Sequence, residues 1–129
     1  EIIKKIELNL RKQNRSLKKL NCLIMGFTFK ENCNDVRNTK VYDIYKSLKL
    51  KVKNVDVFDP LIEKLHLKQY HNIKIIKFPK NNVYDVIIIS VAHDLFKKLG
   101  IKKIKKFGKN NVLIFDVKNT FPNKKLLYL

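Results

Sequence analysis

Lysine, cysteine, aspartate and arginine side chains lie close together in one mainly polar segment, residues 26–40. Its charged residues include Lys30, Asp35 and Arg37, and Cys33 lies between Lys30 and Asp35. A helical pattern begins directly after them, and a helix start attracts anions through its free backbone N–H groups and its dipole. This spacing therefore predicts an anion-binding site. Cys33 is also a candidate nucleophile, because neighbouring cations favour the reactive thiolate form of a cysteine.

The residues on either side of this segment predict a buried strand and a helix. Cys22 to Met25 form an unbroken apolar run, as expected for a strand buried on both faces of a parallel sheet, and Gly26 ends the run. A helix is expected over residues 38–49, with Asn38 and Thr39 at its start. Its apolar residues recur at helical spacing, namely Val41, Tyr42, Ile44, Tyr45 and Leu48. An open α/β sheet binds ligands at the carboxyl ends of its strands, which is where this loop lies.

The glycine pattern of a dinucleotide-binding turn is missing from this loop. That turn requires G-x-G-x-x-G, so that the backbone can approach a pyrophosphate. Here Gly26 stands alone and is followed by Phe27, Thr28 and Phe29. We therefore expect the loop to bind its ligand through side chains, mainly Phe29, Lys30 and Arg37.

Apolar patterns along the chain predict five strands that alternate with helices. The strands are expected at Cys22–Phe27, Val55–Phe58, Ile73–Lys77, Val86–Val91 and Val112–Phe115. Helices are expected over 1–12, 38–49 and 61–70, and in two pieces on either side of Gly100. The fold class that follows is α/β, with a Rossmann-like, doubly wound, mainly parallel five-stranded sheet and helices on both faces. The first strand should be central.

Two polar residues follow predicted strands. Asp59 precedes Pro60, and an acidic residue there would hold a ribose in an NAD-binding domain. Without the upstream glycine pattern, we interpret Asp59 as a turn or helix cap. His93 lies at the carboxyl end of a strand, where it is a helix cap, a packing group or a ligand contact.

Size and composition indicate one globular domain of 129 residues, 45% of them hydrophobic. The net charge of +18 raises the possibility of nucleic-acid binding. All but three of the 29 basic residues are lysines spread along the chain, so we interpret them mainly as solvated surface. Such a surface would also attract anionic ligands.

The sequence also bears on compartment and on metal binding. Charges interrupt the first apolar residues, so no signal peptide is expected, and no apolar stretch is long enough to cross a membrane. Two cysteines, Cys22 and Cys33, predict neither a disulfide framework nor a metal site. We expect a cytoplasmic, reduced protein. Because the chain begins with Glu1 rather than Met, we expect a fragment of a longer protein.

Residues 26–41 read Gly-Phe-Thr-Phe-Lys-Glu-Asn-Cys-Asn-Asp-Val-Arg-Asn-Thr-Lys-Val. This stretch resembles the start of the C-terminal, UDP-binding domain of the UDP-glucose/GDP-mannose dehydrogenase family. It is most similar to the branch that oxidises UDP-N-acetylhexosamines, where F-K-E-N-C-x-D-x-R-N-T-K is typical. Three later segments resemble the family in the same order, so the resemblance spans about residues 17–122. These segments are Val57–Pro60, Tyr84–His93 and Phe115–Lys118.

The resemblance implies roles for individual residues. Phe29, Lys30 and Lys118 would contact the nucleotide sugar, and Arg37 would reach the pyrophosphate of NAD. Relatives that act on UDP-glucose carry an arginine at the position of Lys118. The alternative is that Lys30 and Lys118 are ordinary surface lysines. Cys33 belongs to the loop signature rather than to the catalytic cysteine motif of the family, so no catalytic residue is assigned.

The resemblance also implies an activity and partners for a longer protein. That protein would be an NAD-dependent UDP-sugar 6-dehydrogenase, which oxidises a C6 hydroxyl to a carboxylate and makes UDP-hexuronic acid for surface polysaccharide. Residues 1–16 would end the helix that links the two domains and supports a homodimer, and residues 17–129 would bind the UDP-sugar. An N-terminal domain would bind NAD and carry the catalytic cysteine, so this chain should be inactive alone.

Other classes of function remain as alternatives. A stand-alone Rossmann-like nucleotide-binding module would share the fold, and a basic nucleic-acid-binding domain would share the charge. A receiver domain would need acids at the ends of strands one and three. Phe27–Phe29 and Phe78-Pro79 occupy those places instead. A salt titration that compares UDP with DNA would separate the nucleotide and nucleic-acid alternatives.

Overall fold

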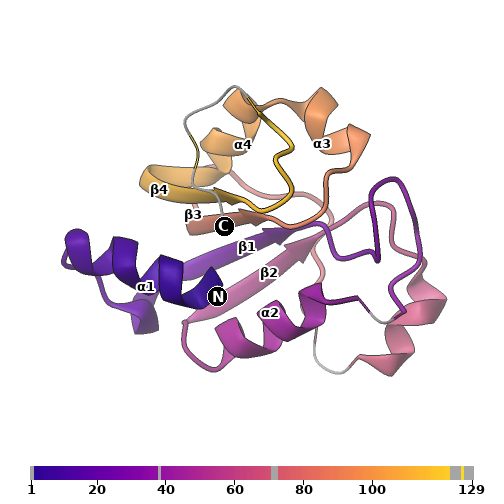
Figure 1. Ribbon diagram of the computed structural model, residues 1–129, viewed down its shortest axis with the longest axis horizontal. Helices are drawn as coiled ribbons and strands as arrows, with labels where there is room; N and C mark the ends of the chain where they lie inside the picture. Colours follow the sequence, from indigo (N-terminus) through magenta and orange to yellow (C-terminus); the bar gives the residue numbers. More distant parts are fainter. Residues whose placement is uncertain (1, 38, 71–72, 123–125, 127–129) are drawn as a thin grey trace.

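A four-stranded parallel sheet forms the centre of the computed structural model, which describes residues 2–37, 39–70, 73–122 and 126 (Figure 1). Its order is β2-β1-β3-β4, and all three neighbouring pairs are parallel. The bounds are β1 Asn21–Met25, β2 Asn54–Phe58, β3 Tyr84–Ile89 and β4 Gly108–Asp116. The predicted α/β class is confirmed, and β1 is an inner strand as expected.

Helices cover both faces of the sheet (Figure 1). Alternate residues of β1 explain this arrangement, because successive side chains of a strand point to opposite faces. Cys22 and Ile24 pack on one face with α1 (Ile2–Lys12) and α2 (Val41–Lys49). Leu23 and Met25 pack on the other face with α3 (Asp94–Leu99) and α4 (Ile101–Phe107). Two short 3₁₀ helices complete the elements, η1 (Leu17–Lys19) and η2 (Lys64–Gln69).

The chain reverses its direction of winding between β1 and β3. From β1 it crosses through α2 to β2, on one side of the sheet order. From β3 it crosses through α3 and α4 to β4, on the opposite side and over the opposite face. Loops that leave β1 and β3 therefore diverge, and a crevice at such a switch point is the usual ligand site of an open α/β sheet.

The predicted fifth strand, Ile73–Lys77, is wrong. This segment touches β2 through a single bridge, Val57 with Ile75. Two backbone bonds flank that bridge, from Val57 N–H to the carbonyl of Lys74 and from Ile76 N–H to the carbonyl of Val57. The chain then bends, and Pro79 has no N–H to extend a ladder. The segment therefore covers part of the edge of β2 without becoming a strand.

Several element boundaries differ from the predicted ones. β1 ends at Met25 rather than Phe27, because Gly26 has φ +98°. A side chain at Gly26 would lie 2.6 Å from Cβ of Val91, so only glycine lets the ends of β1 and β3 approach this closely. The predicted helix 38–49 begins at Val41, and Asn38 lies outside the described residues. The helix predicted over 61–70 is the shorter 3₁₀ helix η2.

Candidate functional site

A cleft of about 310 Å³ opens at the carboxyl ends of the strands, at the switch point. Three loops line it: the segment after β1, the segment after β3 and the turn after β4. Its lining residues are Thr28, Phe29, Lys30, Glu31, Thr39, Lys40, Val41, Ser90, Val91, Ala92 and Lys118.

The structure places three of the four sequence-predicted site residues around this cleft. Phe29, Lys30 and Lys118 line it, although 88 positions of the chain separate the two lysines. Both lysines are exposed, and the ring of Phe29 is 60% exposed. At this exposure the Phe29 ring is not part of the hydrophobic core and is available to a ligand. Binding by these residues stays a prediction.

Arg37 is not part of the cleft lining. Its guanidinium makes a two-pronged ion pair with the carboxylate of Asp35, with Nε–Oδ1 at 3.0 Å and Nη2–Oδ2 at 2.8 Å. The Asp35 hydrogen bonds and charge raise the pKa of Arg37. The side chain is 66% exposed, so the fork is held in one orientation while its outer N–H groups stay in solvent.

A buried carboxylate lies beneath the loop that carries Lys30, residues 26–40, which we call the Lys30 loop. Oδ2 of Asp59 accepts the backbone N–H groups of Phe27 (2.7 Å) and Thr28 (3.3 Å), and Oδ1 accepts that of Leu61 (3.0 Å). The Asp59 side chain has no exposed surface. The interpretation of Asp59 as a turn-forming residue is confirmed, because a fully buried carboxylate that holds three N–H groups cannot reach a ribose.

His93 contacts the same loop at two points. Its Nε2 lies 2.9 Å from Oδ2 of Asp59 and 3.2 Å from Oγ1 of Thr28, and its Nδ1 accepts the backbone N–H of Asn32 at 2.9 Å. The residue is 0% exposed. Of the three alternatives for His93, the structure supports a packing group that also makes hydrogen bonds, since the ring is buried against Phe96 and does not line the cleft. His93 precedes α3, but its side chain does not cap that helix.

A second buried carboxylate holds the turn that carries Lys118, residues 117–121, which we call the Lys118 turn. Asp116 ends β4 with no exposed surface, and its two oxygens accept the N–H groups of Thr120 and Phe121, both at 2.8 Å. Asn119 adopts the left-handed conformation, with φ 54°. Asp116 was not among the residues predicted to form the site. A strand-terminal Asp followed by a polar turn is the signal that could have indicated its role.

The charge of the cleft is positive. Lys30, Lys40 and Lys118 contribute three ammonium groups against one carboxylate, from Glu31. Lys40 immediately precedes α2 and lines the cleft, so a basic residue and the helix N-terminus adjoin the same space. The sequence analysis did not assign Lys40, although it lies within the loop signature. The cleft can therefore hold an anion, with Phe29 as an adjoining apolar surface.

Thiol and metal chemistry find no support at this edge. The Cys33 thiol accepts one backbone N–H, from Asp35 at 3.3 Å, and within the described part of the chain no hydrogen bond joins it to an acid or a base. Burial raises the pKa of Cys22 to about 12, which keeps that thiol protonated. No group of three His, Cys, Asp or Glu side chains that could hold a metal ion occurs among the residues described. Over the same residues, no helix is long and apolar enough to span a bilayer.

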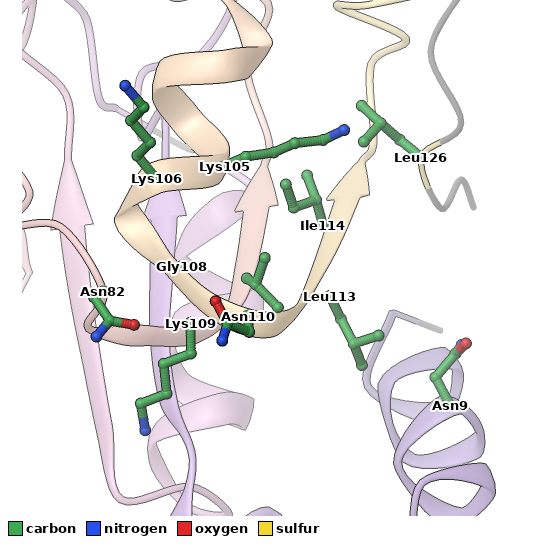
Figure 2. Close-up of a pocket in the computed structure, with 11 residues that line it drawn as sticks. Asn9, Asn82, Lys105, Lys106, Gly108, Lys109, Asn110, Leu113, Ile114 and Leu126 are labelled. Carbon is green, nitrogen blue, oxygen red and sulfur yellow. The ribbon is translucent and has the colours of Figure 1, made fainter.

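A larger cavity, of about 700 Å³, lies beside the outer edge of β4 (Figure 2). Lys105, Gly108, Asn110 and Leu113 are among the residues that line it, and Asn9 approaches from α1. No acid, histidine or cysteine is found in its lining as far as the structure describes it. None of the predicted site residues lies there. The smaller cleft, which combines the switch point with aromatic and cationic groups, is therefore the candidate site.

A protein-family model described as "UDP-glucose/GDP-mannose dehydrogenase family, UDP binding domain" matches residues 23–123. UDP-N-acetyl-D-glucosamine 6-dehydrogenase of Pseudomonas aeruginosa is 44% identical over 96 residues, covering 74% of this chain and 23% of that protein. The enzyme of the same name from Salmonella typhi is 40% identical over 100 residues, covering 78% and 24%. Protein CapL of Staphylococcus aureus is 32% identical over 120 residues, covering 91% and 27%.

Solved structures share the fold at lower identity. UDP-D-ManNAc dehydrogenase from Pyrococcus horikoshii superimposes with a TM-score of 0.70 at 18% identity, covering 95% of this chain and 28% of that one. The UDP-N-acetyl-mannosamine dehydrogenase Cap5O from S. aureus gives 0.65 at 20% identity, covering 98% and 28%. The chain therefore spans about a quarter of the length of its relatives.

Proposed function

Because the chain belongs to the UDP-glucose/GDP-mannose dehydrogenase family, as its C-terminal UDP-binding domain, we propose that the cleft at the switch point binds the nucleotide of a UDP-sugar. Membership confirms the resemblance that the loop signature predicted. The observation that carries the proposal is the meeting of Phe29, Lys30 and Lys118 around one cleft.

The groups in this cleft suit a nucleotide diphosphate. Lys30, Lys40 and Lys118 bring positive charge to the place where the pyrophosphate would lie, and the N-terminus of α2 faces it. The open ring of Phe29 offers an apolar face for a base or a sugar. Ser90 is not available as a donor to a ligand, since its one hydroxyl proton is shared between the carbonyls of Gly26 (2.6 Å) and Met25 (3.1 Å).

We assign Arg37 to a different ligand, the NAD cofactor of the same enzyme. It lies outside the cleft lining, on the loop that carries Lys30, and its ion pair with Asp35 keeps the guanidinium fork outside the cleft. This position suits contact with a cofactor that another domain holds. The assignment gives two cations of one loop two different ligands.

The complete enzyme, on this proposal, is an NAD-dependent UDP-sugar 6-dehydrogenase. It oxidises the C6 hydroxyl of a UDP-N-acetylhexosamine to a carboxylate, and the product supplies surface polysaccharide. A separate domain holds NAD and the catalytic cysteine. Residues 1–16 form the end of the helix that links the domains and supports a homodimer, with the turn that follows it. The names of the relatives from P. aeruginosa and S. typhi support this reaction class.

Calorimetric titration of the 129-residue chain with UDP tests the proposed site. We expect UDP to bind, and Lys30→Ala to weaken binding about ten- to a hundredfold, the size expected for one charge-assisted contact. Lys118→Ala should weaken it less, because Lys118 is the only one of the described residues that its turn contributes to the cleft, whereas Lys30 stands among four consecutive lining residues. Lys102→Ala, on the exposed face of α4, is the matched control that removes the same charge elsewhere.

Equal affinity of all three lysine variants would contradict the site. A duplex DNA titration over the same salt range separates specific binding from general attraction to a basic surface. The chain alone should show no turnover with any UDP-sugar and NAD. Turnover that Cys33→Ser abolishes would overturn the assignment of catalysis to another domain.

A further inference from the structure

A chain of buried polar groups lies directly beneath the exposed part of the Lys30 loop. Thr28, Asp59 and His93 are all buried, and they join through Nε2 of His93, which lies within 3.2 Å of the other two side chains. The nucleotide contacts assigned above do not use any of them. Buried polar groups are costly unless each one is satisfied, so a cluster this complete fixes the geometry around it.

The contacts of His93 fix its tautomer. Nδ1 accepts the backbone N–H of Asn32, so it carries no proton. Nε2 then carries the proton and donates it to the carboxylate of Asp59. The ring is therefore neutral. It joins Asp59, beneath the loop, to the backbone of Asn32, at the tip of the loop.

The side chain of Asn32 makes a second hydrogen bond to the segment around His93. Its Oδ1 accepts the backbone N–H of Asp94, at the first residue of α3, at 2.9 Å. Its own backbone lies in the left-handed region, with φ 57°. Two hydrogen bonds, in opposite directions, thus clip the tip of the Lys30 loop to the corner between β3 and α3.

The backbone between these fixed points carries the two proposed ligand residues. Oγ1 of Thr28 donates to the carbonyl of Lys30 at 2.9 Å, and Phe29 N–H donates to the carbonyl of Asp35 at 2.7 Å. Phe29 and Lys30 are exposed, but their main chain is held at both ends. Such preorganisation lowers the entropy that binding must remove.

We propose that His93 and Asn32 are positioning residues of the nucleotide site, which hold Phe29 and Lys30 in the binding geometry without touching the ligand. This inference rests on the proposed function of the cleft. It gives the buried histidine a role beyond packing. The bond from Asn32 N–H to Nδ1 is the contact that sets the height of the loop tip over the cleft.

Two replacements of His93 test the contacts of Nδ1 and Nε2 separately. In His93→Asn, the short amide oxygen takes the place of Nδ1 and still accepts from Asn32. In His93→Gln, the longer amide takes the place of Nε2 and still donates to Asp59, but the bond to Asn32 is lost. We expect His93→Gln to weaken UDP binding about tenfold or more, and His93→Asn to stay within about threefold of the wild type.

A second pair of variants avoids the core. Asn32→Gly keeps the N–H and tolerates the positive φ but removes the bond to Asp94, and should weaken UDP binding about three- to tenfold. Asn82→Gly is the matched control, since Asn82 is exposed, has φ 58° and lies outside the cleft. Amide hydrogen exchange at residue 32 should accelerate in His93→Gln and remain slow in His93→Asn.

The outcomes separate this inference from the proposed function. If the wild type binds UDP and Lys30→Ala weakens it, but His93→Gln and Asn32→Gly bind as the wild type does, the positioning role alone is overturned. If His93→Asn and His93→Gln weaken UDP binding equally, and amide exchange at residue 32 is unchanged, the bond from Asn32 N–H to Nδ1 of His93 does not position the loop, and the inference is overturned. Absence of UDP binding in the wild type would overturn both.

Discussion

The Lys30 loop and the Lys118 turn bring cations to the same cleft in two different ways. Each depends on an aspartate with no exposed side-chain surface at the end of a strand. Asp59 holds backbone groups 31 and 32 residues away, across the sheet from β2 to β1. Asp116 holds groups only four and five residues away, within its own turn.

The difference lies in what each structure requires in order to form. The Lys118 turn needs only its own short sequence, since one carboxylate folds the backbone that follows it. The Lys30 loop needs the completed sheet, because Asp59 and His93 come from other strand ends. The position of Lys30 is therefore a property of the tertiary fold, and that of Lys118 a local one.

The largest effect is expected from Asp59→Ala. Three backbone N–H groups and Nε2 of His93 would lose their shared acceptor in the core, so the free energy of unfolding should fall by about 3–5 kcal/mol. Urea unfolding followed by circular dichroism measures this loss. A change below about 1 kcal/mol would show that the Lys30 loop does not depend on the carboxylate.

Asp116→Ala should have a smaller effect on stability, about 2 kcal/mol, because water can reach part of the released turn. The same unfolding measurement applies, with Asp43→Ala as a control in an exposed acid of α2. UDP affinity should fall to the level of Lys118→Ala and no further. A loss as large as that of Lys30→Ala would mean that the two regions are coupled.

Within the Lys30 loop, two cations seven positions apart should act on different ligands. In a dehydrogenase that carries this domain together with its NAD-binding domain, Lys30→Ala should weaken UDP-sugar binding and Arg37→Ala should weaken NAD binding. Each loss should be about ten- to a hundredfold. Paired titrations with both ligands measure it, and equal losses of both ligands in both variants would indicate a disordered loop.

The smallest effect concerns the two thiols. At pH 8 a Cys22 pKa of about 12 leaves roughly one thiol in ten thousand ionised, so iodoacetamide should spare Cys22 and label the half-buried Cys33. Mass spectrometry identifies the site. Because Cys33 lies outside the cleft lining, labelling should change UDP affinity by less than about threefold. A larger loss would place the thiol in the binding surface.

The parts of the fold that the sequence predicted are those with local signals. Cys22–Met25 and Val86–Ile89 are unbroken apolar runs, and both became inner strands of a parallel sheet. Ile73–Lys77 reads Ile-Lys-Ile-Ile-Lys, so lysines interrupt its apolar residues, and a single bridge joins it to β2. A short segment rich in β-branched residues does not by itself show whether it becomes a strand or only covers a strand edge.

The candidate site divides in the same way. A signature in sequence was sufficient to select Phe29, Lys30 and Lys118, and the fold brings them around one cleft. The bond between His93 and Asn32 joins positions 61 residues apart, so no local pattern could indicate it. The pairing of Arg37 with Asp35 spans two residues, and opposite charges at that spacing were the available signal.

Because Lys30 and Lys118 lie far apart along the chain, the proposed site is complete only in the fully folded domain. Lys30 follows the first strand and Lys118 follows the last, so the cleft is complete only when β4 has docked beside β3. Partly folded chains that lack this final docking would lose the contribution of Lys118 to nucleotide binding. A ligand that binds only the native state raises the free energy of unfolding by about 2.7 kcal/mol at a hundred times its Kd. UDP would thus stabilise the fully folded domain, because it would contact residues that follow the first and the last strand.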